Sequence, residues 1–185
     1  MKIIVLKENY NTLTFPEVYI VPDSAILKDG KPFFVPSFAE QFQFNTHLIV
    51  KIDRLGKNIS KRFASRYYSQ YSVGLTVTAH GEELSGAMVN AFDSSAIMGD
   101  FIAKEAADSG VIETYIDDKL IHSLDTSTMC NDIDAIIEHI SKYFTLKIGD
   151  IIYTGYKADN LAELQINQTI TAKIAGEEVL HFHTR

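Results

Sequence analysis

The chain has 185 residues, 46% of them hydrophobic, which is enough for one well-buried core and too few for two ordinary domains. We therefore expect a single domain over residues 1–185. The net charge of -7 argues against nucleic acid or an anionic membrane as a partner, because both attract basic surfaces. Cys130 is the only cysteine, which excludes an internal disulfide or a cysteine zinc cluster and fits a cytoplasmic location.

Strand signals run along the whole chain, as short runs of β-branched and aromatic residues bounded by turn formers. They predict strands at residues 2–6, 17–21, 32–36, 48–52, 73–79, 112–117, 150–155 and 170–174. The first of these, in MKIIVLKENY, is too short and too interrupted for a signal peptide or a membrane span. We find no internal repeat and no linker, so the elements indicate one mixed, mostly β domain.

Two helices are predicted where apolar residues recur every three or four positions. The first covers residues 60–70. The second covers residues 126–144, with Thr126 or Ser127 as its N-cap. Its apolar stripe consists of Met129, Ile133, Ile136, Ile137, Ile140 and Phe144.

The segment LKIGDIIYTG, residues 146–155, resembles the PGDVILTGTP signature of the fumarylacetoacetate hydrolase family. Other segments resemble landmarks of that family in the same order along the chain. They are ENY (8–10), FNTHLIVKIDRLGKNI (44–59), YSQYSVGLTVTAH (68–80), NAFDSSAIMGDFI (90–102) and IDDKLIHSLDTSTM (116–129). Each segment alone is a weak signal, and their common order makes the resemblance specific.

The resemblance implies a fold, a chemistry and an assembly. The fold is a mostly β, or α+β, twisted mixed β-sheet roll around a central cavity, with one long helix packed outside it and one or more short helices. Family members bind Mg²⁺ or a similar cation through two glutamates and an aspartate, and a 2-oxo or 1,3-dicarbonyl acid chelates that metal. Hydrolysis, isomerisation or decarboxylation follows. The family is typically homodimeric.

At the aligned positions this chain lacks the family's carboxylates. The two glutamates fall on Asn45 and His47, and the aspartate falls on Thr76. The family's arginine falls on His80 and its lysine on Asn90. Candidates for a substrate pocket are Asn45, His47, Thr76, His80, Asn90, Thr154, Gly155 and Tyr156. We expect no metal ligands and no cofactor, and we assign no catalytic residue.

Two functions stay open. In the first, the chain keeps the fold but has lost metal catalysis, and it binds a small molecule such as a keto acid or acts as a partner protein. In the second, it is an Mg²⁺- or Mn²⁺-dependent hydrolase, isomerase or decarboxylase whose ligands come from unaligned carboxylates. Candidates for those ligands are Glu40, Glu82, Glu83 and Asp93.

Two other interpretations of Asn45 and His47 also stay open. Asn45 can cap a turn beside an ordinary, half-buried His47. Alternatively, Asn45, His47 and His80 can hold a softer ion such as zinc.

Overall fold

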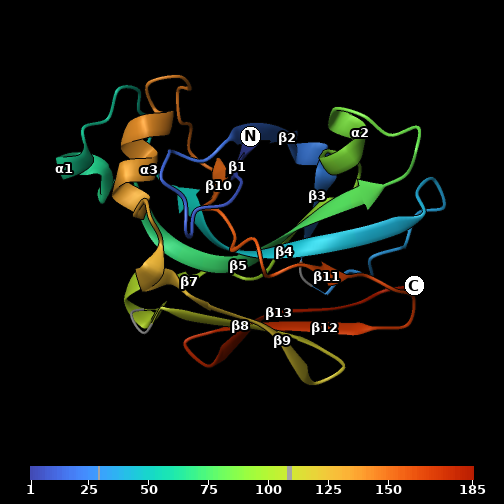
Figure 1. Cartoon of the computed structure of the whole chain (residues 1–185). Coiled ribbons are helices and arrows are strands. Elements are labelled where there is room, and N and C mark those ends of the chain that lie inside the picture. Colours follow the sequence, from blue (N-terminus) through green and yellow to red (C-terminus); the bar gives the residue numbers. More distant parts are fainter. Residues whose placement is uncertain (29, 108–109) are drawn as a thin grey trace.

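Two β-sheets packed face to face form the body of the protein (Figure 1). The computed structural model describes residues 1–28, 30–107 and 110–185. In Figure 1 the long strands β4 (Gln41–Ile52) and β5 (Tyr68–His80) cross the centre, and the second sheet lies below them. The first strand, β1, and the helix α2 lie on the opposite side of β4 and β5. The fold is therefore the mostly β, curled mixed sheet expected from the family resemblance.

Nine of the described strands form the larger sheet, in the order β2-β1-β10-β4-β5-β6-β3, with β11 paired to β4 and β7 to β5. It is mixed, because β1 pairs with β10 and β3 with β6 in parallel, whereas β4 and β5 are antiparallel. Besides β4 and β5, its strands are β1 (Lys2–Leu6), β2 (Val18–Pro22), β3 (Ile26–Lys28), β6 (Ala96–Met98), β7 (Ile102–Ala103), β10 (Ile151–Tyr153) and β11 (Ala162–Glu163).

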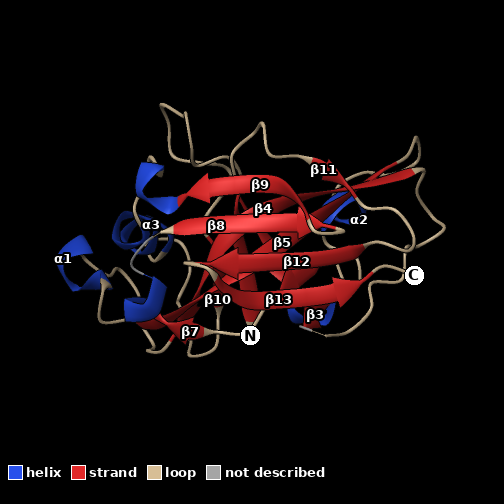
Figure 2. Cartoon of the chain, turned by 90° about the horizontal axis from the view of Figure 1, so that it is seen from below, coloured by secondary structure: helices blue, strands red, loops and turns tan. Residues whose placement is uncertain are grey.

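The smaller sheet covers one face of the larger one, as Figure 2 shows from below. In the described chain it has four antiparallel strands in the order β13-β12-β8-β9. These are β8 (Val111–Ile116), β9 (Lys119–Asp125), β12 (Thr169–Ile174) and β13 (Glu177–His183).

Alternation along β4 separates two hydrophobic layers. Phe44, Leu48 and Val50 belong to the main core, which also includes buried residues of the smaller sheet. Ile49 points to the opposite face of the larger sheet, where it packs in a second cluster with Tyr153. Successive strand residues point to opposite faces, so the same register places Asn45 and His47 on this second face. We call it the concave face.

Helices are short and few, and the predicted helices were too long. The described helices are α1 (Lys61–Ala64), α2 (Ala87–Asn90), α3 (Ile133–Ile140) and the 3-10 turns η1 (Asp23–Ala25), η2 (Lys104–Ala107) and η3 (Thr126–Thr128). No helix in the described ranges is long and apolar enough to cross a membrane.

The predicted helix over residues 126–144 is wrong in its first half. The helix α3 starts at Ile133, and its N-cap is Asp132, whose carboxylate accepts a hydrogen bond from the Ala135 amide. The preceding segment cannot continue the helix, because the Cys130 amide donates to the carbonyl of Asn9. A contact distant in sequence therefore overrides the local apolar period.

The predicted helix over residues 60–70 is also wrong beyond its first turn. Only Lys61–Ala64 is helical, and the chain enters strand β5 at Tyr68. The aromatic residues there recur at helical spacing, but aromatic residues also favour strands. Pairing with β4 makes this segment a strand.

Most predicted strands are present, but residues 32–36 are not a strand. Phe33 alone makes an isolated bridge, to Thr184. Pro32 and Pro36, the two end residues of this segment, have no backbone N–H to donate to a neighbouring strand, which explains the loss of regular pairing.

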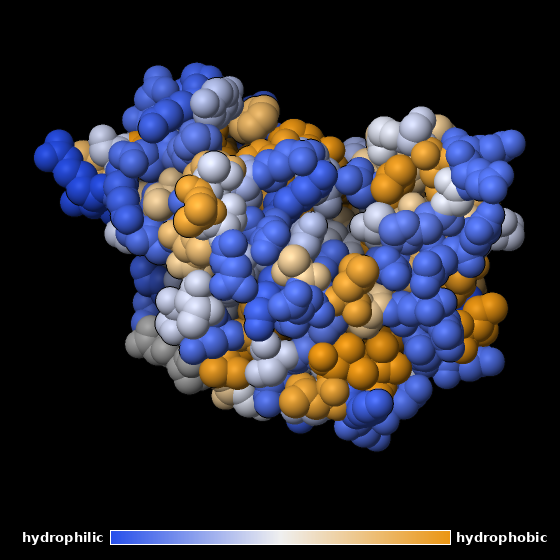
Figure 3. Space-filling model, in the orientation of Figure 1, coloured by the Kyte–Doolittle hydropathy of each residue, from blue (hydrophilic) through white to orange (hydrophobic). Residues whose placement is uncertain are grey.

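The surface mixes polar and apolar residues. On the face in Figure 3, hydrophilic residues cover most of the area and hydrophobic residues form separate patches between them. Scattered exposure of this kind is ordinary for a folded chain.

One buried aspartate joins the starts of β1 and β10 to the end of β4. Asp150 is 1% exposed and lies just before β10. Its side chain accepts hydrogen bonds from the amides of Lys2 and Lys147 at 3.0 and 2.7 Å, and it forms an ion pair with the Lys2 ammonium. The neighbouring Asp150 carbonyl accepts from the Ile52 amide at the end of β4.

Replacing this carboxylate should destabilise the fold. We expect Asp150→Asn to lower the free energy of unfolding by about 2–4 kcal/mol, because it leaves the part-buried donors of Lys2 and Lys147 without a charged acceptor. Urea denaturation measures the change. The matched control is Asp159→Asn, an exposed position that should change stability by less than about 0.5 kcal/mol. Equal, small effects for the two variants would contradict this role of Asp150.

Candidate functional site

The three positions aligned with the family's carboxylates meet at the centre of the concave face. In the β4–β5 ladder Asn45 lies opposite Thr76, and His47 lies two residues further along β4 on the same side. The imidazole Nε2 of His47 is 2.8 Å from the hydroxyl of Thr76. The sequence prediction that Asn45, His47 and Thr76 lie together is therefore consistent with the structure.

His47 is fully buried, and this determines its charge. Its exposed fraction is 0%, and Nδ1 has no hydrogen-bond partner among the described residues. Burial lowers the pKa of the imidazole to about 3, because a charged ring there would lose its hydration. His47 is therefore neutral near physiological pH, and a base this weak is poorly suited to abstract a proton.

Tyr153 covers the space above β5. Its ring packs edge-on against His47 with centroids 5.4 Å apart, and its hydroxyl donates to the Ile97 carbonyl at 3.0 Å. The ring fits only because residue 74 is glycine, since a Cβ there would lie 2.5 Å from the ring. Tyr153 thus reaches from β10 across β4 and β5 to β6 and covers the concave face beside His47.

Two further tyrosines enclose the same point. The ring of Tyr156 packs edge-on against His47, with centroids 5.4 Å apart. Tyr19, on β2, lies near Thr76 and Tyr156, and burial raises the pKa of its phenol. With these rings around them, Asn45 and Thr76 are only 6% and 3% exposed. The site is closed to water and holds no charge.

Asn45 has one unpaired atom in this enclosure. Its amide oxygen is buried without a hydrogen-bond partner among the residues described. The interpretation of Asn45 as a turn cap is wrong, because it lies inside β4, and His47 is fully rather than half buried.

Thr154 and Gly155 have a structural role instead of facing a pocket. The Thr154 hydroxyl donates to the Leu48 carbonyl at 3.0 Å, and its own carbonyl accepts from the Asn9 side chain at 3.0 Å. Gly155 has φ 107°, and a Cβ there would lie 2.4 Å from Asn9. Thr154 and Gly155 therefore hold the N-terminal segment around Asn9 against the chain at the end of β10.

His80 and Asn90 lie away from the cluster. His80 is the exposed last residue of β5, opposite Gln41, and four residues along a strand place it about 13 Å from Thr76. The structure therefore does not bring His80 to Asn45 and His47, as the zinc interpretation requires. Asn90 is the last residue of α2, in the connection between β5 and β6.

The unaligned carboxylates lie elsewhere. Glu40, Glu82 and Glu83 are exposed and line one shallow cavity of about 360 Å³ at the end of β4 and β5. Asp93 lies on the loop after α2 and does not line that cavity. Among the described residues no three His, Cys, Asp or Glu side chains are grouped so that they could hold a metal ion.

Sequence reasoning missed the two tyrosines that close the site. Tyr153 stands where the signature quoted above has leucine, and that change was a readable signal. Tyr19 lies in a segment without a family landmark, so only the pairing of β1 with β2 reveals its position.

Comparison with protein families gives one extended match. The family model for the fumarylacetoacetate (FAA) hydrolase C-terminal region matches residues 5–181.

Individual relatives include enzymes with named activities. The mitochondrial oxaloacetate tautomerase of Rattus norvegicus is 27% identical over 188 residues, covering 96% of this chain and 85% of the relative. The structure of 2-hydroxyhepta-2,4-diene-1,7-dioate isomerase from Mycobacterium marinum is 26% identical with a TM-score of 0.89, covering 99% of this chain and 73% of the other.

A third comparison includes a metal. The structure of fumarylpyruvate hydrolase from Pseudomonas aeruginosa, in complex with Mn²⁺ and pyruvate, has a TM-score of 0.87 and covers 100% of this chain and 89% of the other. At 17% identity this likeness concerns the fold alone.

Burial of neutral His47 makes stability depend on pH. The folded pKa of about 3 lies below the unfolded value of 6.5, so the unfolded chain binds a proton first as pH falls. Stability is complete above the unfolded pKa and falls below it. Between pH ~7 and ~5 we expect a loss of about 2 kcal/mol from this residue, measured by urea denaturation. His122, whose pKa burial lowers to about 4, adds a loss of the same sign.

Substitution separates the two contributions. His47→Gln should remove about 2 kcal/mol of the difference in unfolding free energy between these two pH values, whatever its effect on stability at neutral pH. His80→Gln, at the exposed end of β5, is the matched control. A His47→Gln variant with the same pH dependence as the parent protein would contradict the burial of an uncharged imidazole.

Proposed function

Since this chain belongs to the fumarylacetoacetate hydrolase family, we propose that it keeps the family fold without its metal-dependent activity and acts as a small-molecule-binding or partner protein. The observation that supports this most is the hydrogen bond between His47 and Thr76, made inside a buried, uncharged site. The single domain, the homodimer and the cytoplasmic location expected from the sequence stay predictions.

The donor set at these positions does not fit Mg²⁺ or Mn²⁺. Such ions need anionic oxygen ligands to offset the loss of their hydration shell. The aligned side chains are an amide, a neutral imidazole and a hydroxyl, and the imidazole is already paired with the hydroxyl. Carbonyl polarisation by a metal is therefore not part of the function that we propose.

Space is a second obstacle to that chemistry. A chelated keto acid needs room beside the metal, and in this chain the rings of Tyr153 and Tyr156 pack against His47 from two directions. Tyr153 is held in place by the bond to the Ile97 carbonyl and by contact with Gly74. Opening the site would break that bond and expose a buried ring.

One observation favours a second candidate, an Mg²⁺- or Mn²⁺-dependent enzyme acting on a 2-oxo or 1,3-dicarbonyl acid. Glu40, Glu82 and Glu83 line one cavity and carry the anionic oxygens that such ions prefer, although their side chains are not grouped closely enough to form a metal site among the described residues. Their exposure to water weakens this candidate, because an exposed site leaves a bound ion largely hydrated and weakly held.

Calorimetric titration of the metal-stripped protein tests the proposal. We expect no saturable heat with Mg²⁺ or Mn²⁺, with or without oxaloacetate, because the aligned positions carry an amide, an imidazole and a hydroxyl in place of carboxylates. The rat oxaloacetate tautomerase, titrated under the same conditions, is the comparison protein.

Saturable Mn²⁺ binding that oxaloacetate strengthens would overturn the proposal. Its location then follows from two variants. Loss of the heat in Glu82→Gln/Glu83→Gln would establish the exposed cavity as the metal site and favour the second candidate. Loss of the heat in His47→Gln, with the glutamate variant unaffected, would place the metal at the aligned positions instead.

A further inference from the structure

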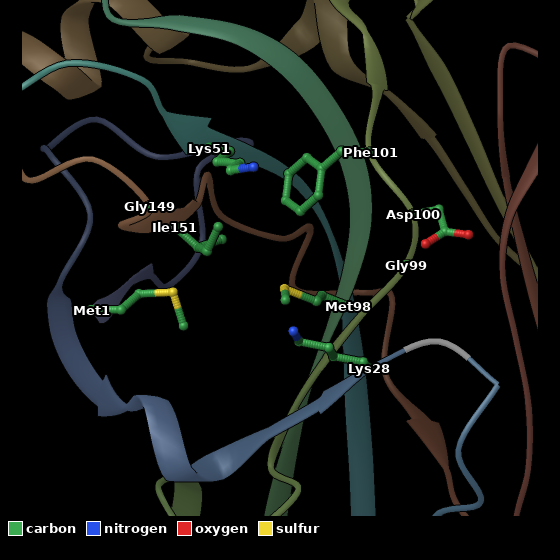
Figure 4. A pocket seen from close by; sticks show the side chains of 9 residues that line it. All are labelled: Met1, Lys28, Lys51, Met98, Gly99, Asp100, Phe101, Gly149 and Ile151. Carbon is green, nitrogen blue, oxygen red and sulfur yellow. The ribbon is translucent and has the colours of Figure 1, made fainter.

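A cavity of about 290 Å³ lies at one end of the concave face, separate from the cluster around His47 (Figure 4). It is lined by residues of several strands of the larger sheet and by the loop after β6. The lining residues used below are Lys28 on β3, Lys51 on β4, Met98 on β6, Ile151 on β10 and Phe101.

Packed side chains separate this cavity from the aligned metal positions. Along β4 the concave side carries His47, Ile49 and Lys51 in succession, so Lys51 lies about 13 Å from His47. Ile49 and Ile151 are 0% and 2% exposed and belong to the hydrophobic layer between the two places. A ligand in the cavity therefore does not touch the site discussed above.

Two lysine side chains line the cavity. In Figure 4 the side chain of Lys28, an exposed residue, extends into the cavity, and the side chain of Lys51 lies at the opposite edge and points toward Phe101. The Lys51 ammonium lies over the Phe101 ring, 5.8 Å from its centroid, which holds a half-buried cation in place. Neither lysine forms an ion pair with a described residue.

Among the residues that the structure describes, the acidic groups near this cavity form no ion pair with the two lysines. Asp100 lines the cavity, but its carboxylate is exposed and points away from the two ammonium groups in Figure 4. Asp23 lies near the amino group of Met1, 3.8 Å away. In a chain with a net charge of -7, this leaves a local positive site suited to an anion.

The remaining walls of the cavity are apolar, so they favour a ligand whose uncharged part is apolar. Met98, Phe101 and Ile151 face the cavity between the two lysines. A volume of about 290 Å³ is at the small end of the range for ligand sites, which is roughly 300–1,000 Å³. Inorganic phosphate would contact the lysines but leave these walls in water, whereas an organic acid would cover both.

We propose that this cavity binds a small organic carboxylate with an apolar body. Lys28 and Lys51 pair with the carboxylate, and Met98, Phe101 and Ile151 contact the apolar part. The proposal does not depend on the loss of metal chemistry, because the two sites share no residue.

Methyl NMR of protein labelled with ¹³C at methionine methyl groups tests the proposal, with phenylacetate as the probe. We expect the Met98 methyl to shift saturably. Met129 lies outside the cavity and should not shift. Met88 lines a different cavity that is wholly apolar, with Phe38, Leu84 and Phe92, so it reports binding through apolar contact alone.

Variants and related probes separate the two parts of the ligand. We expect Lys51→Gln and Lys28→Gln each to weaken phenylacetate binding by about fivefold or more, and added salt to weaken it in the parent. Lys142→Gln, at an exposed position after α3, is the matched control. Phenylacetamide, which lacks the charge, should shift Met98 much less.

Several outcomes would overturn the proposal. They are the absence of any Met98 shift, a shift of Met88 alone, equal binding of phenylacetamide, or equal binding of inorganic phosphate. Binding of phenylacetate together with Mn²⁺ binding in calorimetry would contradict the proposed function and leave this inference intact.

Discussion

The hydrogen bond between His47 and Thr76 holds the centre of the concave face in a neutral and closed state. Both residues project from the long β4–β5 ladder, so their separation is set by backbone pairing. Because burial keeps the imidazole uncharged, tyrosine rings can pack against it without meeting a desolvated charge. A carboxylate in place of the His47 or Thr76 side chain would be a buried charge, and it would need a cation beside it to offset its desolvation.

Other contacts that hold the fold together lie outside that centre. They are made by Asp150 with the amides of Lys2 and Lys147, and by Asn9 with Thr154. Gly155 allows the close approach at the second place. Of these residues, Asn9, Lys147, Asp150, Thr154 and Gly155 lie in segments that resemble the family. The residues that make these contacts are thus different from those at the aligned metal positions. A chain can therefore keep the fold while the chemistry of the site changes.

Most strands predicted from the sequence are present, because strand signals depend on local sequence, but residues 32–36 are not a strand and β9 and β13 were not predicted. The position of Asn45 and His47 on one face of β4 follows from strand alternation. The helix limits could not be predicted, since the start of α3 depends on the distant contact between Cys130 and Asn9. The closure of the site by Tyr153 could not be predicted either, because the ring fits only against Gly74, a residue 79 places earlier in the chain. The two-lysine cavity joins four strands and has no local signature.

Crystals grown with Mn²⁺ and pyruvate, examined by anomalous scattering at the manganese edge, test the central claim most directly. The account predicts no manganese peak near Asn45, His47 and Thr76, with the Tyr153 ring still over Gly74 and its hydroxyl on the Ile97 carbonyl. A manganese ion coordinated by Nδ1 of His47 and the amide oxygen of Asn45, with Tyr153 displaced, would contradict it.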